Sequence, residues 1–275
     1  MTFRVIKVIS ISLITFLLIT LFIGLYLRTK YLNPVLMYHY VVEDAALAKK
    51  DKRVVTVKSF DKQMRFLKAN NYNVISLEAL VSLIRAKKKI PQNTIVITFD
   101  DGHLDNYTNA YPILKKYNLQ ATMFVIVDYL SSPNFMTQEQ IKEMSDSGLV
   151  TIGSHTLTEK YLPKIKEENV LKREIFESKN KLESILGKPV NCFSYPIGGF
   201  NKAIRQMVID AWYGVAVATS PGLNYPNDDP FAIKRVRISE SSKSLFIFWF
   251  EISGTYKYFL ELRKNSEQAK QKKNG

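Results

Sequence analysis

Residues 94–102 read Thr94-Ile-Val-Ile-Thr-Phe-Asp-Asp-Gly102, an apolar run that ends in two carboxylates and a glycine. A short apolar run bounded by turn residues is typical of a buried strand. In barrels built from alternating strands and helices, the chemistry gathers at the carboxyl ends of the strands. The stretch therefore predicts a buried strand that carries Asp100 and Asp101 to a functional edge, although Asp-Asp-Gly also forms ordinary turns.

Strand patterns and helical patterns alternate on both sides of this stretch. Apolar runs predict further strands at residues 35–39, 73–75, 121–127, 149–152, 190–195 and 215–219. Helical patterns lie between them at residues 59–70, 77–84, 107–117, from 137 onward, 168–186 and 201–212. Ser59 and the Thr137/Gln140 capping box are expected to begin two of these helices, and Gly187 to end the longest. The alternation predicts an α/β domain round a mostly parallel sheet or barrel.

The N-terminal residues 1–30 contain a long apolar segment. Residues 8–27 carry no charge over twenty positions, which is enough for a helix to cross a hydrocarbon core of roughly 30 Å. Arg4 and Lys7 precede it as in a signal peptide, but no cleavage motif of small residues follows. We predict an uncleaved membrane anchor, with a cleaved signal peptide as the alternative. Basic residues flank both ends, so they do not set the orientation.

The C-terminal residues 241–275 form an aromatic and then Lys-rich extension. The stretch Leu245-Phe-Ile-Phe-Trp-Phe250 is aromatic and uncharged. It is expected to be a packed outer element of the domain, or otherwise an interfacial membrane contact.

The chain is strongly basic, with 39 Lys and Arg against 25 Asp and Glu and a formal charge of +14. Such a charge favours anionic neighbours such as lipid headgroups or cell-wall polymers, or it forms ordinary solvated faces. No zinc-finger spacing, Arg-rich helix or interleaving of aromatic and basic residues is present, so no nucleic-acid partner is expected. Cys192 is the only cysteine, which excludes an intrachain disulfide.

Two further polar clusters follow predicted strands. His155 and Glu159 are four residues apart, a spacing that would place both on one face of a helical turn, although such pairs are more often structural. The stretch Phe193-Ser-Tyr-Pro-Ile-Gly198 predicts a strand exit that can present a backbone N–H to an oxyanion.

In this order, the three clusters resemble the motifs of the NodB-type polysaccharide deacetylases, carbohydrate esterase family 4. The matching motifs are Thr98-Phe-Asp-Asp-Gly102, Gly153-Ser-His155 and Ser194-Tyr-Pro-Ile-Gly198. Similar supporting stretches are Pro34-Val-Leu-Met-Tyr-His39, Ala121-Thr-Met-Phe-Val125, Leu186-Gly-Lys-Pro189 and Lys234-Arg-Val-Arg-Ile238. The resemblance covers residues 34–240 and places the domain at residues 31–240. The chain is most similar in look to the poly-N-acetylglucosamine deacetylase subgroup, whose barrel is thought to be circularly permuted.

The resemblance implies a distorted (β/α) barrel, hydrolysis of an acetamide and a divalent metal ion, usually Zn²⁺, with Mn²⁺, Fe²⁺, Co²⁺ or Ni²⁺ as alternatives. Asp101 and His155 would bind the metal, and Asp100 would be the base that deprotonates the attacking water. The backbone N–H of Ile197 would face the oxyanion. The other residues carried over to oxyanion or substrate binding are Tyr195, Pro196 and Arg235.

Three departures from the family pattern bear on the site. Glu159 stands where the family's second motif has its second histidine, and a carboxylate is a competent ligand, so we expect an Asp101/His155/Glu159 site. The alternative is a decayed metal site in a pseudoenzyme. Ser194 stands where many members have an arginine. No histidine follows His155, and His39 is expected to replace the late histidine as general acid, or to be structural. His103 is expected at a loop or substrate rim.

The sequence thus predicts a membrane-anchored, metal-dependent polysaccharide deacetylase whose catalytic domain lies in the periplasm or outside the cell. The expected substrate is poly-N-acetylglucosamine, peptidoglycan or a lipid-linked sugar. One alternative is a catalytically impaired, membrane-tethered glycan-binding protein of the same fold. Another is an interaction protein that recruits polysaccharide synthase or export machinery through its aromatic C-terminal segment.

Overall fold

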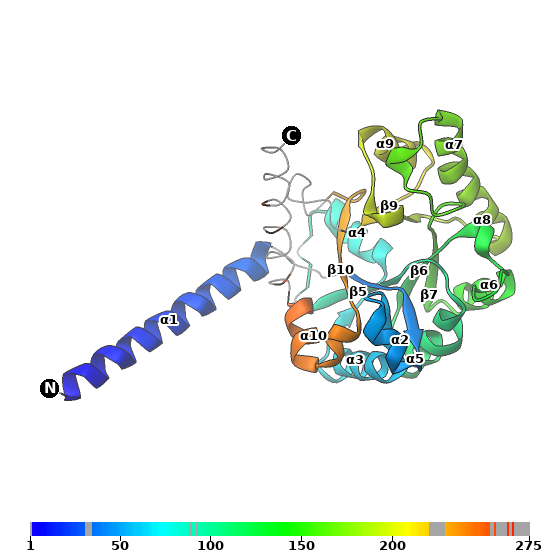
Figure 1. Cartoon of the computed structure of the whole chain (residues 1–275). Coiled ribbons are helices and arrows are strands. Elements are labelled where there is room, and N and C mark those ends of the chain that lie inside the picture. The colour runs from blue at the N-terminus through cyan, green and yellow to red at the C-terminus, as the bar shows by residue number, and fades with distance from the viewer. Residues whose placement is uncertain are drawn as a thin grey trace.

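The computed structural model describes residues 2–30, 35–88, 90–91, 93–219 and 229–253, together with residues 256, 263 and 266. Figure 1 shows a long N-terminal helix, α1, and a domain in which helices surround a central sheet.

The sheet has eight strands, of which seven close into a parallel barrel while β4 (Asn73–Val74) stays at the edge beside β5. The barrel strands are β1 (Val35–Tyr38), β5 (Thr94–Phe99), β6 (Ala121–Val125), β7 (Val150–Ser154), β8 (Cys192–Ser194), β9 (Val215–Ala218) and β10 (Ile233–Arg237). β1 closes the ring because it pairs with β10 on one side and with β5 on the other. The predicted (β/α) barrel is confirmed, and its first strand lies next to its last.

Helices cover the outside of the barrel (Figure 1). They are α3 (Val57–Ala69), α4 (Leu77–Arg85), η1 (Asn106–Ala110) with α5 (Tyr111–Tyr117), α6 (Gln138–Asp146), the continuous run α7 (Glu168–Lys172), η4 (Arg173–Glu177) and α8 (Ser178–Leu186), and α9 (Lys202–Asp210). The capping box of α6 and the left-handed Gly187 after α8 are confirmed. The cap predicted for α3 was wrong: Thr56 accepts from the Ser59 N–H, because Thr56 has the extended backbone that a cap needs.

One small lobe and one barrel strand were not predicted as such. A small lobe follows β1 and consists of β2 (Tyr40–Val42), α2 (Ala45–Lys50) and β3 (Val54–Thr56). Its two strands have only three residues each, too short to show a periodic pattern. The residues of β10 resemble a stretch of the deacetylase family, but they were not predicted to form a strand because charged residues interrupt their apolar pattern.

The aromatic C-terminal segment forms η6 (Glu240–Lys243) and α10 (Leu245–Ile252). Phe248 and Ile252 are buried, and the Phe248 ring contacts the Phe66 ring of α3 at a centroid distance of 6.0 Å. This confirms the packed outer element at α10. Phe246 and Trp249 remain exposed on the same helix. Most of residues 254–275 lie outside the described residues.

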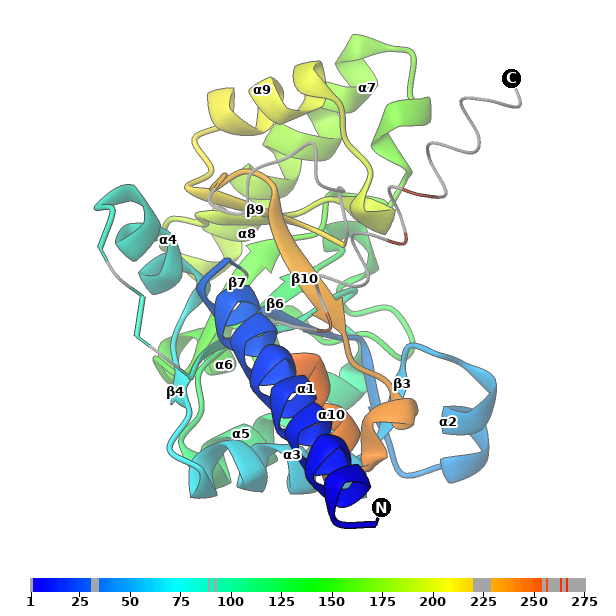
Figure 2. The same ribbon diagram turned by 90° about the vertical axis from the view of Figure 1, so that its left-hand side faces the viewer.

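Helix α1 (Thr2–Lys30) projects away from the barrel in Figure 1 and lies in front of it, towards the viewer, in Figure 2. α10 lies on the side of the barrel from which α1 projects. In the parts of the chain that the structure describes, no helix combines the length and the apolar character needed to cross a membrane. The predicted span at residues 8–27 is not confirmed and stays a prediction.

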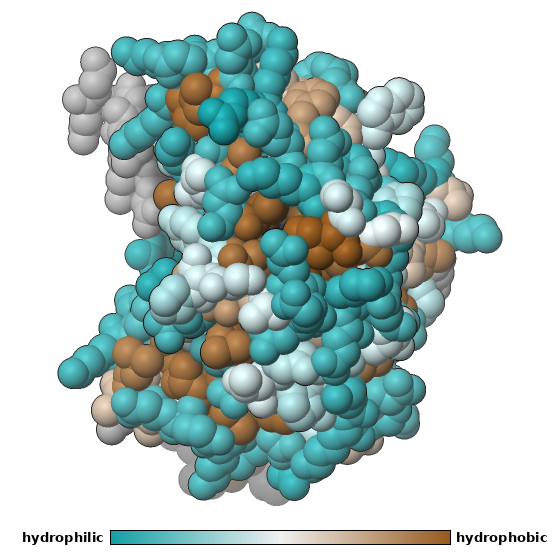
Figure 3. Space-filling view, turned by 90° about the vertical axis from the view of Figure 1, so that its right-hand side faces the viewer, coloured by the Kyte–Doolittle hydropathy of each residue, from teal (hydrophilic) through white to brown (hydrophobic). Residues whose placement is uncertain are grey.

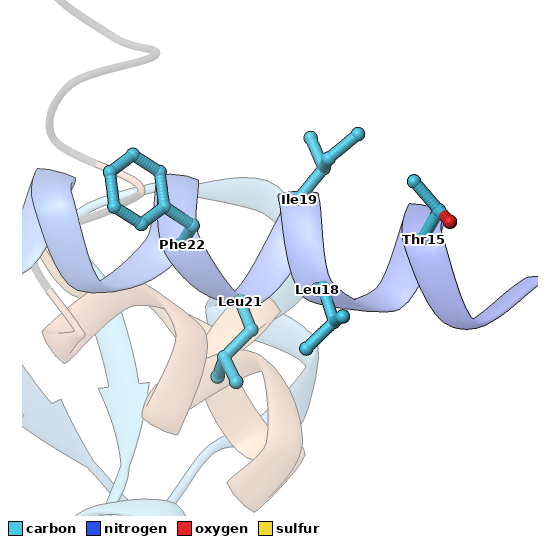
Figure 4. A pocket seen from close by; sticks show the side chains of 5 residues that line it. All are labelled: Thr15, Leu18, Ile19, Leu21 and Phe22. Atoms are coloured by element: carbon cyan, nitrogen blue, oxygen red, sulfur yellow. The ribbon is translucent and has the colours of Figure 1, made fainter.

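A surface hollow on α1 is lined by Thr15, Leu18, Ile19, Leu21 and Phe22. Figure 4 shows that all five side chains come from this one helix. Because no other described element lines the hollow, it has no walls that could enclose a ligand.

On the face turned away from α1, apolar side chains gather near the middle and hydrophilic side chains surround them (Figure 3). The surface of α1 differs, because its exposed large side chains between Ile9 and Ile23 are all hydrophobic. Exposed apolar surface of that extent marks a contact with a membrane or another protein.

Candidate metal centre

Three potential metal ligands converge at the carboxyl ends of the barrel strands. Asp101 follows β5, His155 follows β7, and Glu159 lies in the loop after His155. Each offers a ligand atom, and these atoms all lie within 4.8 Å of one another. The His155 Nε2 atom is 3.5 Å from Oδ1 of Asp101. The neighbouring aspartate and the distant imidazole are thus close enough to share one ion, as the sequence predicted.

The loop that carries Glu159 is not the helical turn that the four-residue spacing suggested. Thr156 and Glu159 both have left-handed backbone, with φ of 66° and 59°. The Thr156 hydroxyl accepts a hydrogen bond from the Glu159 N–H at 3.1 Å. Left-handed backbone is costly for residues other than glycine and is often found at functional sites. A tight turn, and not helical periodicity, brings Glu159 back towards His155.

Glu174 stabilises this turn through hydrogen bonds. Its buried carboxylate accepts hydrogen bonds from the backbone N–H groups of Leu157 and Thr158, each at 3.0 Å, and from the Thr158 hydroxyl at 2.5 Å. Glu174 lies in the π-helical turn η4, an irregularity that is frequent at functional sites. Sequence reasoning missed this residue, because nothing in a helical glutamate signals contacts 16 and 17 residues earlier.

His155 is oriented for metal binding by its other ring nitrogen. Nδ1 lies 2.9 Å from the Ser194 carbonyl oxygen. A carbonyl only accepts, so Nδ1 donates this hydrogen bond and Nε2 is left facing Asp101, where its lone pair would bind a metal ion. Such a hydrogen bond to the remote nitrogen is usual for metal-binding histidines.

The charges of the site also suit a cation. Burial raises the pKa of Glu159 above its ordinary value, and the negative charge of Asp101 raises it further. Burial acts in the same direction on Asp101, but the hydrogen bond from His103 and the charge of His155 outweigh it and hold the pKa of Asp101 well below its ordinary value. A divalent ion would relieve the repulsion between the two carboxylates. Two carboxylates and one imidazole are a donor set that Zn²⁺, Mn²⁺ and Fe²⁺ accept.

Asp100 points to a different partner from that of Asp101. Arg235 of β10 donates to both Asp100 oxygens, Nη1 to Oδ1 and Nη2 to Oδ2, each at 2.6 Å. Arg235 also donates to the hydroxyls of Ser194 at 3.0 Å and Thr98 at 3.2 Å. Burial raises the pKa of Asp100, but the charges of Arg235 and His155 outweigh it and lower the pKa below its ordinary value. Asp100 is therefore held as an ionised carboxylate.

The expected substrate-binding role of Arg235 is not supported. The Arg235 side chain is 0% exposed, so it cannot reach a polysaccharide. Ser194, which stands where many family members have an arginine, leaves room for a guanidinium that comes from β10 instead. The sequence carried no clear signal for this burial, because four consecutive residues from Ile233 to Val236 are buried and the stretch does not alternate.

His39 lies beside the two aspartates. Tyr38 is in register with Phe99, and the Asp100 N–H donates to the Tyr38 carbonyl at 3.0 Å, so the residues that follow the two strands are neighbours. Among the described residues, the buried His39 Nδ1 atom has no hydrogen-bond partner. Burial lowers the pKa of His39, more than the charges of Asp100 and Asp101 raise it. His39 thus lies beside the candidate site, where its expected role as general acid would require it.

Comparison with known proteins agrees with this geometry. The family model for polysaccharide deacetylases matches residues 87–216. A Bacillus subtilis protein named as a polysaccharide deacetylase is 32% identical over 206 residues, 75% of this chain and 71% of the relative. The chain belongs to the polysaccharide deacetylase family. It is therefore a member of a family of hydrolases that act on acetylated polysaccharides.

Other relatives of this polysaccharide deacetylase have a named substrate or a solved structure. The poly-β-1,6-N-acetyl-D-glucosamine N-deacetylase of Staphylococcus epidermidis is 29% identical over 204 residues, 68% of this chain and 69% of the relative. The structure of the Streptococcus pyogenes deacetylase PplD, solved with acetate, superposes with a TM-score of 0.73 at 27% identity and covers 80% of this chain and 97% of that one. A Bacillus cereus polysaccharide deacetylase has a TM-score of 0.69 at 32% identity, with coverage of 80% and 68%.

The third motif of the deacetylase forms a tight turn, η5 (Pro196–Gly198). Tyr195 and Pro196 are buried, and the Tyr195 hydroxyl donates to the Phe231 carbonyl at 3.1 Å, so these two residues support the turn and do not face a substrate. Ile197 has left-handed backbone (φ 57°, ψ 10°), and its side chain is 73% exposed. This backbone is unusual for a β-branched residue and is of the kind that clusters at functional sites. Gly198 is required, because a Cβ atom there would lie 2.6 Å from the Thr219 nitrogen.

His103 of the deacetylase lies in the loop after β5, one of its two expected positions, but it is buried and does not lie at a rim. Its Nε2 atom is 3.2 Å from Oδ2 of Asp101, and its ring stacks on Tyr40 at 3.8 Å between centroids. His103 therefore orients the candidate ligand Asp101.

Proposed function

We propose that the chain is a metal-dependent hydrolase that removes N-acetyl groups from an N-acetylhexosamine-containing polysaccharide of the poly-N-acetylglucosamine type. The convergence of Asp101, His155 and Glu159 beside the ionised Asp100 carries this proposal. The relative named as a poly-β-1,6-N-acetyl-D-glucosamine N-deacetylase supports the substrate class.

In the proposed reaction, Asp101, His155 and Glu159 would hold a divalent ion, most readily Zn²⁺. The ion would supply Lewis acidity to the acetamide carbonyl and to water. Asp100, kept ionised by Arg235, would take the proton from the attacking water. Its bidentate ion pair fixes the direction in which the carboxylate can accept.

Two further groups would act on the acetamide. The backbone N–H of Ile197 would stabilise the developing oxyanion, a contribution of about 3–4 kcal/mol for one well-placed donor. His39, adjacent to Asp100 along the sheet edge, would protonate the leaving amine. The products are acetate and a glycan that carries a free amine.

The function is tested by acetate release from poly-N-acetylglucosamine by the full-length protein. We expect release in the presence of Zn²⁺, its loss after treatment with a chelator, and its recovery when the metal is restored. Purified protein should hold close to one divalent ion per chain, measured by elemental analysis. Glu159→Ala should lower this metal content, because it removes one of the three ligands.

The same measurements distinguish the alternative function. A protein that binds the glycan but holds no stoichiometric metal and releases no acetate under any metal would be a glycan-binding pseudoenzyme. Glu159→Ala with unchanged metal content and activity would exclude Glu159 as a ligand without contradicting the hydrolase.

We further propose that α1 anchors the chain in the cell membrane as a single-pass helix, with the domain in the periplasm or outside the cell. Support comes from the uncharged residues 8–27 and from the location of N-acetylated polymers outside the membrane. The exposed Phe246 and Trp249 of α10 would then lie near the lipid surface. Recruitment of polysaccharide synthase or export machinery through this face stays a prediction.

Replacement of Leu18 and Phe22 by arginine is expected to release the protein from membranes, since each arginine near a helix centre costs about 2.5–3.5 kcal/mol. The measurement is the fraction of full-length protein that sediments with membranes after an alkaline wash. Leu18→Ile with Phe22→Leu is the matched control and should stay with the membranes. Sedimentation of the arginine variant to the same extent as this control would contradict the anchor.

A further inference from the structure

Tyr161 joins the two loops that form the candidate site. It lies two residues after Glu159, and its ring edge rests on Gly199, two residues after Ile197. A Cβ atom added at Gly199 would lie 2.0 Å from Cε2 of Tyr161 and 2.8 Å from its Cδ2 and Cζ atoms. Only glycine leaves room for the ring, although the Gly199 backbone (φ −90°, ψ 125°) is ordinary. The absence of a side chain at Gly199 therefore leaves the space that the Tyr161 ring occupies.

The backbone of Tyr161 is well fixed, whereas its ring is partly open. The Tyr161 carbonyl accepts from the Lys164 N–H at 3.0 Å, and the next residue, Leu162, is fully buried. Tyr161 itself is 37% exposed. Within the described residues, its hydroxyl makes no hydrogen bond. The ring is thus held against Gly199 on one side, and its hydroxyl is available to a ligand.

An exposed tyrosine ring with an available hydroxyl suits a sugar, which has apolar C–H faces and hydroxyl groups. Binding sites are commonly lined by aromatic and apolar side chains with a few polar groups. The exposed Ile197 side chain supplies further apolar surface on the adjoining loop. We propose that Tyr161 is a substrate-binding residue that stacks on an N-acetylhexosamine ring of the polysaccharide and offers it a hydrogen bond. This inference rests on the proposed function and names the recognition element of that site.

The matched control is another exposed aromatic residue. Trp212 is 85% exposed and lies in the turn between α9 and β9, at the amino end of its strand and so at the opposite end of the barrel from the site. If exposed aromatic residues bound glycans unspecifically, Trp212→Leu and Tyr161→Leu would have equal effects.

The test compares Tyr161→Leu, Tyr161→Phe and Trp212→Leu in the full-length, Zn²⁺-loaded protein. The measurements are KM and kcat for acetate release from N-acetylglucosamine oligomers, and Kd for the same oligomers by calorimetry. Tyr161→Leu is expected to raise KM and Kd about three- to tenfold, the range of one lost aromatic contact. Tyr161→Phe keeps the ring and should show a smaller rise. Trp212→Leu should leave both constants unchanged.

Gly199→Ala provides an independent route to the same result, because the new methyl group must displace the Tyr161 ring. Its rise in KM should match that of Tyr161→Leu. The double variant should show no further rise, since both changes remove one contact.

Unchanged KM and Kd in Tyr161→Leu would overturn the proposal, and so would equal effects of Tyr161→Leu and Trp212→Leu. A fall in metal content in Tyr161→Leu would also overturn it, because Tyr161 would then support the Glu159 loop and not the sugar. Failure of the proposed function is separate: wild-type protein would release no acetate, and the calorimetric Kd would still decide whether Tyr161 binds the glycan.

Discussion

Asp100→Asn is expected to lower the rate of acetate release by a factor of about 10²–10⁴, the range that general acid–base catalysis contributes. The amide has the size of the carboxylate but cannot accept the proton of the attacking water. Asp101, His155 and Glu159 are unchanged, so the metal content should stay the same. The measurement is kcat for acetate release together with elemental analysis of the same preparation.

A control is needed because Asp100→Asn also leaves the Arg235 charge buried without its partner. Thermal unfolding of the variant should show that it remains folded at the assay temperature. Asp61→Asn removes a partly exposed carboxylate that pairs with the exposed Lys116 and should change neither activity nor stability by much. Activity of Asp100→Asn within a few-fold of wild type would exclude Asp100 as the base.

Arg235→Met is expected to lower the free energy of unfolding by about 3–5 kcal/mol, because it leaves the buried Asp100 carboxylate without its ion pair. The Arg235 side chain is fully buried, so water cannot replace the two hydrogen bonds that it donates. Acetate release should also fall, since the carboxylate is no longer held in position. The measurement is chemical denaturation of the full-length protein alongside kcat.

The double variant Asp100→Asn with Arg235→Met distinguishes the loss of the ion pair from the loss of packing contacts. Its loss of stability should be smaller than the sum of the two single losses, because no buried charge remains unpaired. Additive losses of stability would show that Asp100 and Arg235 do not stabilise each other. Arg235→Lys should not restore wild-type activity, because an ammonium group cannot make the two parallel hydrogen bonds.

Much of the fold could be predicted from local patterns. The strand at residues 94–99 was predicted with its observed ends, because all six of its side chains are buried and its run is uninterrupted. The capping box at Thr137 and the glycine at 187 acted as start and stop signals that depend only on neighbouring backbone. By contrast, β2 and β3 pair with each other across a small lobe, and three-residue strands carry too little pattern to be recognised.

The candidate ligands could be named from the sequence, but their arrangement could not. A four-residue spacing was interpreted as a helical turn, whereas left-handed backbone at Thr156 and Glu159 and the carboxylate of Glu174 form the loop. Arg235 was predicted to bind the substrate, because the sequence shows that the residue is charged but does not show that it is buried.

The sequence by itself determined the α/β class, the alternation of most strands and helices between residues 35 and 219, and the residue types that gather after the strands, because these depend on apolar periodicity and on short motifs. Only the tertiary structure decided which groups meet. The pairing of β1 with both β5 and β10 brings His39 beside Asp100 and brings Arg235 across the barrel to Asp100. These contacts join residues that lie 61 to 135 positions apart along the chain, where no local pattern specifies a partner.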